Sequence, residues 1–304
     1  MQFEIKKHLV TKTAGGAQYF IQSYHFNNNP GGKIFYIQAN VHGIEIAWIP
    51  VIYELMDYIE KNNSQINIIC VPKANPFWMD SQIMWVQTWY NNIHTNSYNC
   101  LNYNRIWANN SYKFEDTIIS TLLEISKDTD VVLDCHSAGL ESLEHIYVHE
   151  NFISQAEIFN IDNILSWQEA GNAFEDVCFS RGQTAFTLEM WASRTADMYR
   201  AQYFLERILF YFWLEKNISK FNTNIRTWQL DDMCERFYSE YEWVLLWNIS
   251  LWDEFKKWDI LAYIYTTDDG KKEIFAPADW VFLIKFPIHA VFKFQEIGQL
   301  MLKK

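Results

Sequence analysis

The chain has 304 residues, 49% of them hydrophobic, which is enough apolar material for one large core or two unequal ones. Its formal net charge of −12 at pH 7, without a basic patch, argues against a nucleic-acid partner, and no apolar run has the ~18–20 residues of a membrane span. Five widely spaced cysteines without a CxxC pair, and an N-terminus without a signal-peptide core, predict a cytoplasmic protein with reduced thiols.

Predicted strands and helices alternate from residue 33 to residue 217. Short β-rich runs predict strands at 33–41, 65–72, 130–136, 145–149 and 184–191. Apolar residues at helical spacing predict helices at 44–61, 113–127, 151–167 and 195–217. Because Pro50 lies early in the first helix, that helix starts later than residue 44 or is kinked. The long, Asn- and Trp-rich segment 73–113 has no clear period, which is typical of a functional loop.

This alternation is typical of an α/β protein with a mixed, largely parallel sheet flanked by helices. The pattern changes after residue 220, where several short runs are separated by turn signals such as TTDDGK. Such spacing is typical of all-β structure. We therefore predict an α/β domain over residues 1–220 and a smaller C-terminal β domain over residues 221–304.

Four polar residues lie at the ends of predicted core strands. His42 and Glu45, in the stretch VHGIE, follow the first strand, His136 ends the third, and Glu189 lies at the end of the fifth. Functional groups of open α/β sheets gather at the carboxyl ends of strands, so we expect these side chains to lie close together. Zn²⁺ prefers imidazole and carboxylate ligands, which makes His42, Glu45 and His136 candidate ligands. Asp134, two residues before His136 on the same strand face, is a candidate to orient it.

Each of these residues also has a structural interpretation. A His-x-x-Glu spacing occurs by chance in many chains, His136 alone fits a hydrogen-bonded histidine at a strand end, and Glu189 alone fits a salt bridge. The stretch HIYVH offers a rival pair, His145 and His149, whose spacing suits a helix although its surroundings predict a strand. We therefore interpret that pair as structural. The metal-site hypothesis depends on the whole set occupying equivalent strand ends.

Taken together, five stretches resemble the succinylglutamate desuccinylase/aspartoacylase family, a branch of the zinc carboxypeptidase fold. They occur in the family's order: VHGIE (41–45), KANP (73–76), LNYNR (101–105), LDCHSAG (133–139) and AFTLEMW (185–191). The resemblance implies a zinc carboxypeptidase-like α/β fold followed by a C-terminal β domain. It implies Zn²⁺ bound by His42, Glu45 and His136. It also implies Glu189 as the general base, with Asn104 and Arg105 binding a substrate carboxylate.

The activity that the resemblance implies is hydrolysis of an amide bond in an N-acyl amino acid or a related carboxylate-bearing small molecule. A carboxypeptidase-like enzyme acting on a peptide end is the alternative within the same chemistry. A non-catalytic ligand-binding protein of the same fold is the alternative from another class. The sequence leaves the substrate and the oligomeric state open.

One departure from the family concerns the oxyanion. Residues 77–104 contain no Arg or Lys, so the arginine that the family carries upstream of its Asn-Arg pair is missing. Arg181, eight residues before Glu189, is a candidate substrate contact, and it or His94 is a candidate replacement for that arginine. The aromatic residues of 77–107 either pack beneath a long loop or form the wall of a pocket for a bulky substrate.

Overall fold

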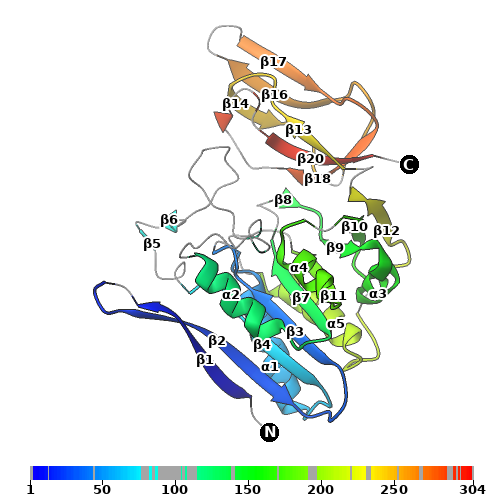
Figure 1. Cartoon of the computed structure of the whole chain (residues 1–304). Helices are drawn as coiled ribbons and strands as arrows, with labels where there is room; N and C mark the ends of the chain where they lie inside the picture. The colour runs from blue at the N-terminus through cyan, green and yellow to red at the C-terminus, as the bar shows by residue number, and fades with distance from the viewer. Residues whose placement is uncertain are drawn as a thin grey trace.

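The structure, a computed structural model, places a large helix-flanked sheet beside smaller antiparallel sheets formed mainly by the C-terminal part of the chain (Figure 1). The described residues are 3–12, 14–43, 45–76, 82–83, 86–87, 104, 107, 115–137, 141–169, 171–190, 197–219, 221–230, 234–251, 253–266, 270–285, 290–291, 294 and 296–302. None of the helices within these ranges is long and apolar enough to cross a membrane.

The large sheet has nine strands in the order β1-β2-β4-β3-β7-β11-β9-β10-β12. They are β1 (Glu4–Lys12), β2 (Gln18–Asn27), β3 (Ile34–Ala39), β4 (Asn67–Val71), β7 (Val131–His136), β9 (His145–His149), β10 (Asn163–Trp167), β11 (Thr184–Glu189) and β12 (Arg226–Gln229). The central strands β4, β3, β7 and β11 run parallel, whereas β1–β2, β2–β4 and β11–β9 are antiparallel pairs. The predicted mixed, largely parallel sheet is confirmed. Strands β3, β7 and β11 consequently end at the same edge.

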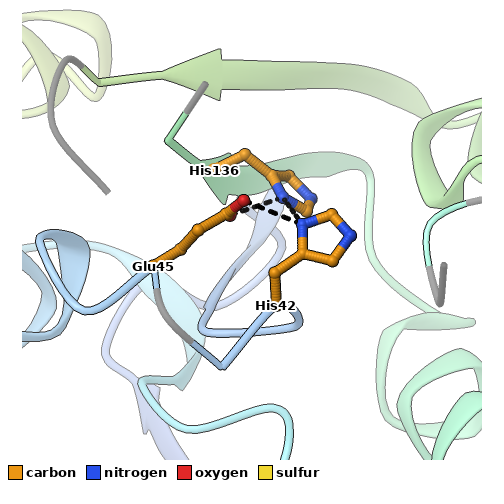
Figure 2. Close-up of side chains that lie close together, drawn as sticks. All are labelled: His42, Glu45 and His136. Atoms are coloured by element: carbon orange, nitrogen blue, oxygen red, sulfur yellow. Dashed lines mark hydrogen bonds and ion pairs between the residues drawn. The ribbon is translucent and has the colours of Figure 1, made fainter. Parts of the chain in front are cut away.

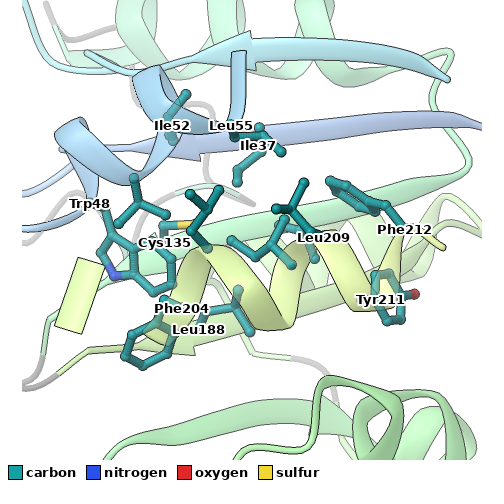
Figure 3. Packing of buried hydrophobic residues seen from close by; sticks show 14 of the residues in the cluster. Ile37, Trp48, Ile52, Leu55, Cys135, Leu188, Phe204, Leu209, Tyr211 and Phe212 are labelled. Atoms are coloured by element: carbon teal, nitrogen blue, oxygen red, sulfur yellow. The ribbon is translucent and has the colours of Figure 1, made fainter. Parts of the chain in front are cut away.

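Helices cover both faces of this sheet (Figure 1). They are α1 (Trp48–Lys61), α2 (Glu115–Ser126), α3 (Ile153–Ala156), α4 (Phe174–Ser180) and α5 (Met198–Tyr211), with 3₁₀ turns η3 (Glu150–Phe152) and η4 (Glu157–Phe159). On one face α1 and α5 pack together over the apolar side chains of the central strands (Figure 3). On the other, Leu122 of α2 and Phe174 of α4 share a buried cluster with Tyr36 of β3. Because both faces are covered, a polar side chain within β3 or β7 needs a hydrogen-bonding partner inside the protein.

The remaining strands form antiparallel sheets. A five-stranded sheet contains β13 (Cys234–Tyr238), β20 (Glu296–Leu302), β18 (Trp280–Lys285), β15 (Glu254–Phe255) and β8 (Glu141–Ser142). A four-stranded sheet contains β17 (Gly270–Phe275), β16 (Ile260–Thr266), β14 (Trp243–Trp247) and β19 (Ala290–Val291), and β5 (Gln82–Ile83) pairs with β6 (Val86–Gln87). Ser142 of β8 is the register partner of Ile284 in β18, which ties the segment after β7 to the C-terminal part. Leu143 also shares a buried cluster with Trp280 and Leu300.

Some element predictions are corrected by the structure. The helix predicted over 151–167 is wrong, because the helical turns end at Phe159 and Asn163–Trp167 is strand β10, buried along its whole length. A short apolar run of this kind is compatible with either element, and only pairing with neighbours decides between them. Helix α1 begins at Trp48, so Pro50 lies in its first turn, where a missing N–H costs no helical hydrogen bond. Strand β12 joins β10, which extends the large sheet beyond residue 220.

Helices α5 and α1 pack against each other in the buried cluster on one face of the large sheet. Phe204 is fully buried, and its ring centroid lies 4.7 Å from that of Trp48. We expect Phe204→Ala to lower the free energy of unfolding by ~3–5 kcal/mol, because the truncation leaves a cavity. Tyr199→Ala on the same helix is the matched control, since Tyr199 is 82% exposed. Urea denaturation would contradict this prediction if the two substitutions had equal effects.

Candidate metal centre

Three side chains converge at the edge where β3 and β7 end. His42 and Glu45 come from the loop after β3, and His136 is the last residue of β7 (Figure 2). Nδ1 of His42 lies 2.9 Å from Oε1 of Glu45, and Nδ1 of His136 lies 2.9 Å from Oε2 of Glu45. The two Nδ1 atoms are 3.2 Å apart. The expectation that these residues lie close together is therefore met.

The loop after β3 is folded so that it presents His42 and Glu45 side by side. Asn40 adopts a left-handed backbone conformation with φ 63°, which asparagine tolerates better than most residues. Its side-chain Nδ2 donates to the carbonyl of Gly43 at 2.9 Å, and the backbone N–H of Glu45 donates to the carbonyl of His42 at 3.0 Å. From the next loop, Nδ2 of Asn75 donates to the carbonyl of Val41 at 3.2 Å. These bonds fix the conformation of the turn.

His136 is held in one orientation by contacts on three sides. Its Nε2 lies 2.8 Å from Oδ2 of Asp134, so Nε2 donates to that carboxylate and Nδ1 faces the cluster. Its backbone carbonyl accepts a hydrogen bond from Nε1 of Trp48 at 2.6 Å and one from the N–H of Met190 at 2.9 Å. The backbone N–H of Ser137 donates to Oε2 of Glu45 at 3.2 Å. The ring and the carboxylate are thus preorganised together.

The charges of the cluster stabilise one another. Burial by itself would raise the pKa of Glu45, but His42 and His136 outweigh it and lower that pKa to about 2. Burial would likewise lower the pKa of His136, but Asp134 and Glu45 outweigh it and hold the pKa well above its usual range. The carboxylate form of Glu45, which is the form that binds metals, therefore persists across the neutral range.

The donor set fits a zinc ion. One ligand atom from each of His42, Glu45 and His136 lies within 4.8 Å of the others, and no further such group occurs in the part of the chain that the structure describes. Ligands bound 2.0–2.1 Å from a tetrahedral ion are roughly 3.3 Å apart, close to the spacings above. Two imidazoles and one carboxylate match the protein ligands of catalytic zinc sites, and the Asp134 contact to His136 matches the carboxylate that usually orients such a histidine.

Glu189 lies on the strand next to His136. It ends β11 and is the register partner of His136 in the parallel β7–β11 pair, so both side chains are on the same face. Its Oε2 is buried and has no hydrogen-bond partner among the described residues. Burial raises the pKa of Glu189 well above its usual range; Glu45 and Asp134 act in the same direction and His136 opposes them. A carboxyl group in this state is suited to accepting and releasing a proton.

The residues predicted to bind the substrate have different outcomes. Asn104 is brought to the centre: its Nδ2 lies 3.4 Å from Nε2 of His136, and its Oδ1 accepts a hydrogen bond from the N–H of Phe174 at 3.1 Å. Arg105 and His94 lie outside the described residues. Arg181 stays a predicted substrate contact, although its described position argues against that role. Its Nη1 donates to the carbonyl of Leu123 at 3.1 Å, and it precedes β11, whereas Glu189 ends that strand. Six residues of extended chain span ~20 Å, which is too far for a shared substrate contact.

The structure also shows buried polar residues that the sequence analysis missed. Gln38 and Tyr36 lie on the same face of β3 and form hydrogen bonds that lead to Asp134. A glutamine inside an otherwise apolar strand was the available signal. Glu175, in the first turn of α4, is buried with its Oε2 unpartnered among the described residues. Burial, and then the charges of Asp134 and Asp176, raise the pKa of Glu175 to about 7. No pattern in the sequence pointed to Glu175.

The fold and this cluster together define a class: a mixed α/β protein with a candidate metal centre at the carboxyl ends of its central strands. No family model and no curated protein matches the sequence. The structure is similar to two proteins assigned to the succinylglutamate desuccinylase/aspartoacylase family, from Shewanella amazonensis and Shewanella frigidimarina. Each is 21% identical, with TM-scores of 0.82 and 0.83, covering 99% of this chain and 99% and 98% of those chains.

A third similar structure is the product-bound ectoine utilization protein EutE (DoeB) from Ruegeria pomeroyi. It is 14% identical with a TM-score of 0.79, covering 100% of this chain and 96% of that chain. The chain therefore has the fold of the succinylglutamate desuccinylase/aspartoacylase family over nearly its whole length. The resemblance predicted from the five sequence stretches is confirmed at the level of the fold.

Glu175 gives the metal-free protein a pH-dependent stability. The unfolded carboxyl group loses its proton near pH 4.5, whereas in the folded protein it does so near pH 7. The contribution of protonated Glu175 to the free energy of unfolding is thus fully present below pH 4.5 and is lost as the pH rises through 7. We expect Glu175→Gln to match the parent at pH 4.5 and to be more stable by on the order of 2–3 kcal/mol at pH 8. Urea denaturation of chelator-treated protein at both pH values measures this, and equal stabilities at pH 8 would contradict it.

Proposed function

We propose that this protein is a zinc-dependent amide hydrolase that removes the acyl group from an N-acyl amino acid or a related carboxylate-bearing small molecule. The observation that carries the proposal is the convergence of His42, Glu45 and His136 beside Glu189. A cluster of two imidazoles and a carboxylate, with a second buried carboxyl group on the next strand, matches the needs of metal-assisted hydrolysis. The fold shared with proteins assigned to the succinylglutamate desuccinylase/aspartoacylase family supports the same chemistry.

In this proposal His42, Glu45 and His136 hold the zinc. When bound there, a zinc ion polarises a carbonyl group and lowers the pKa of a bound water molecule to ~7. Glu189 accepts a proton from the attacking water and delivers it to the leaving amine. Burial raises its pKa well above its usual range, which favours uptake of the proton from the water. Asp134 keeps His136 oriented through its 2.8 Å contact with Nε2.

Recognition of the substrate is assigned to Asn104 and Arg105. Arginine binds a carboxylate through two parallel hydrogen bonds, which fixes orientation as well as adding affinity. Asn104 accepts a hydrogen bond from the N–H of Phe174 in the first turn of α4, and its Nδ2 lies 3.4 Å from Nε2 of His136. A substrate with a carboxylate close to its amide bond would fit this arrangement. An acylated amino acid and the end of a peptide both meet that description. Of the two, we propose the acylated amino acid as the substrate.

One observation favours a second candidate function, binding of a carboxylate ligand without catalysis. Residues 77–104 lack any Arg or Lys that could stabilise an oxyanion, and Nη1 of Arg181 donates to the carbonyl of Leu123. Loss of one oxyanion donor typically lowers a rate by ~100–1000-fold. A protein that binds a carboxylate ligand at the centre without turning it over would have the same residues. The two functions differ in one result: only the hydrolase shows turnover that a chelator abolishes.

The first test of the proposed reaction is Glu189→Gln. We expect kcat to fall by ~100–10,000-fold, because the variant cannot carry the proton, while the zinc content stays near one per chain. Glu157→Gln, at an exposed position, is the matched control and should keep full activity. Activity is measured on a panel of N-acyl amino acids, and zinc by elemental analysis. A parent protein without stoichiometric zinc, or His42→Ala with unchanged activity, would sink the proposal.

The second test separates Arg105 from Arg181. We expect Arg105→Lys to lower kcat/KM by ~10–100-fold, since a hydrogen bond to a charged group contributes ~1.5–3 kcal/mol and lysine cannot form the paired bonds. Arg181→Ala should leave kcat/KM unchanged, because its guanidinium contacts Leu123 instead. Steady-state kinetics on the best substrate of the panel gives both values. The reverse outcome would show that Arg181, and not Arg105, binds the substrate.

A further inference from the structure

We propose that Tyr36 and Gln38 are positioning residues of the metal centre: they hold Asp134, and through it His136, in the orientation that zinc binding needs. This inference rests on the proposed function and extends it to two residues inside strand β3. Both would act through a hydrogen-bonded chain that crosses from β3 to β7.

The hydrogen-bonded chain from Tyr36 to His136 is continuous and buried. The hydroxyl of Tyr36 donates to Oε1 of Gln38 at 2.7 Å, and Nε2 of Gln38 donates to Oδ1 of Asp134 at 2.8 Å. The other carboxylate oxygen, Oδ2, contacts Nε2 of His136 at 2.8 Å. Tyr36, Gln38 and Asp134 are 0% exposed and His136 is 2% exposed. Bulk water therefore does not compete at any link.

The sheet register brings these groups together. Gln38 and Asp134 are direct partners in the parallel β3–β7 pair, so their side chains lie next to each other on one face. Tyr36 is two residues before Gln38, and His136 is two residues after Asp134, so all four share that face. Each link therefore joins groups whose backbone positions are fixed by the ladder. The hydrogen-bonded chain is therefore as rigid as the sheet.

Donors and acceptors allow one arrangement of the chain. With Nδ1 of His136 facing the cluster, Nε2 carries the proton and donates to Asp134. The free oxygen of Asp134 can only accept, so the amide of Gln38 presents its NH₂ group there and turns its oxygen toward Tyr36. A flipped amide would set its oxygen against the carboxylate. Tyr36 supplies the donor that holds the amide in the productive orientation.

Tyr36 remains a donor under all ordinary conditions. Its ring packs against Phe174 of α4 with centroids 5.8 Å apart. Burial, and then the charge of Asp134, raise the pKa of its hydroxyl well above the usual range. If the hydroxyl were removed, Oε1 of Gln38 would be a buried acceptor without a donor. The free-energy cost of that unsatisfied acceptor could be relieved only by moving the amide. Such movement would release Asp134 and loosen the His136 ring.

The experiment measures metal affinity in Tyr36→Phe and Gln38→Met. The controls are a Tyr→Phe and a Gln→Met change at buried sites away from the centre. Tyr211 is 8% exposed and stacks on Phe159 on the opposite face of the sheet. Gln183 is 4% exposed and donates through Nε2 to the carbonyls of Ser126 and Thr129. Zinc dissociation constants are obtained by competition with a chromophoric chelator, and unfolding of each metal-free variant is measured beside them.

We expect Tyr36→Phe and Gln38→Met to weaken zinc binding by about 10–100-fold, the range typical for residues that orient a metal-bound histidine. Their cobalt-substituted forms should show an altered visible absorption spectrum, which reports ligand geometry independently of stability. Tyr211→Phe and Gln183→Met should retain the parental zinc affinity and cobalt spectrum, even where Gln183→Met unfolds more easily.

Three results would overturn the inference, and they differ in what else they contradict. If the parent binds zinc but Tyr36→Phe and Gln38→Met match it in affinity and cobalt spectrum, the chain only satisfies buried polar groups, and the proposed hydrolase stands. If affinity falls equally in Gln38→Met and Gln183→Met, the loss follows stability and positioning is rejected. A parent that binds no zinc removes the inference together with the proposed function.

Discussion

The register of the parallel strands β3, β7 and β11 is the constraint on which the rest of the centre depends. It sets Gln38 beside Asp134 and, two residues further along β7, His136 beside Glu189. A shift by one residue in β7 would turn Asp134 and His136 to the opposite face, among the side chains of α1 and α5. The apolar residues that alternate with them, Leu133 and Cys135, already fill that face and lock the register. Core packing and site geometry are therefore specified by the same strand.

The centre concentrates ionisable groups in a region that solvent hardly reaches. Glu45, Asp134 and Glu175 are each less than 10% exposed, and Oε2 of Glu189 is fully covered. Burying a carboxylate is costly unless it is paired and hydrogen-bonded. Glu45 and Asp134 have such partners in His136, whereas Glu175 and Glu189 respond by a raised pKa. Among the described residues the acidic groups exceed the basic ones here, so a bound cation would relieve the imbalance.

The parts of the centre that could be predicted were those fixed by strand ends. His42, Glu45 and His136 follow runs whose β-rich composition is plain, and parallel strands bring such ends to one edge. Arg181 is the converse case. Its nearness to Glu189 in sequence suggested nearness in space, but an extended strand separates residues further than any other element does. Strand β10 was mistaken for helix because five consecutive buried residues carry no period.

The buried chain through Gln38 could not be predicted, because its partners come from two strands whose register the sequence does not state. Taken alone, Gln38 is a polar residue in an otherwise apolar buried strand, where it would be destabilising without a partner. Once it is paired with Asp134, it becomes the polar group that a covered face requires. Replacing it with an apolar residue would help packing of an isolated strand, yet it would leave a buried carboxylate one hydrogen bond short. Retaining glutamine there is explained if the orientation of Asp134 matters more to this protein than the added apolar contact.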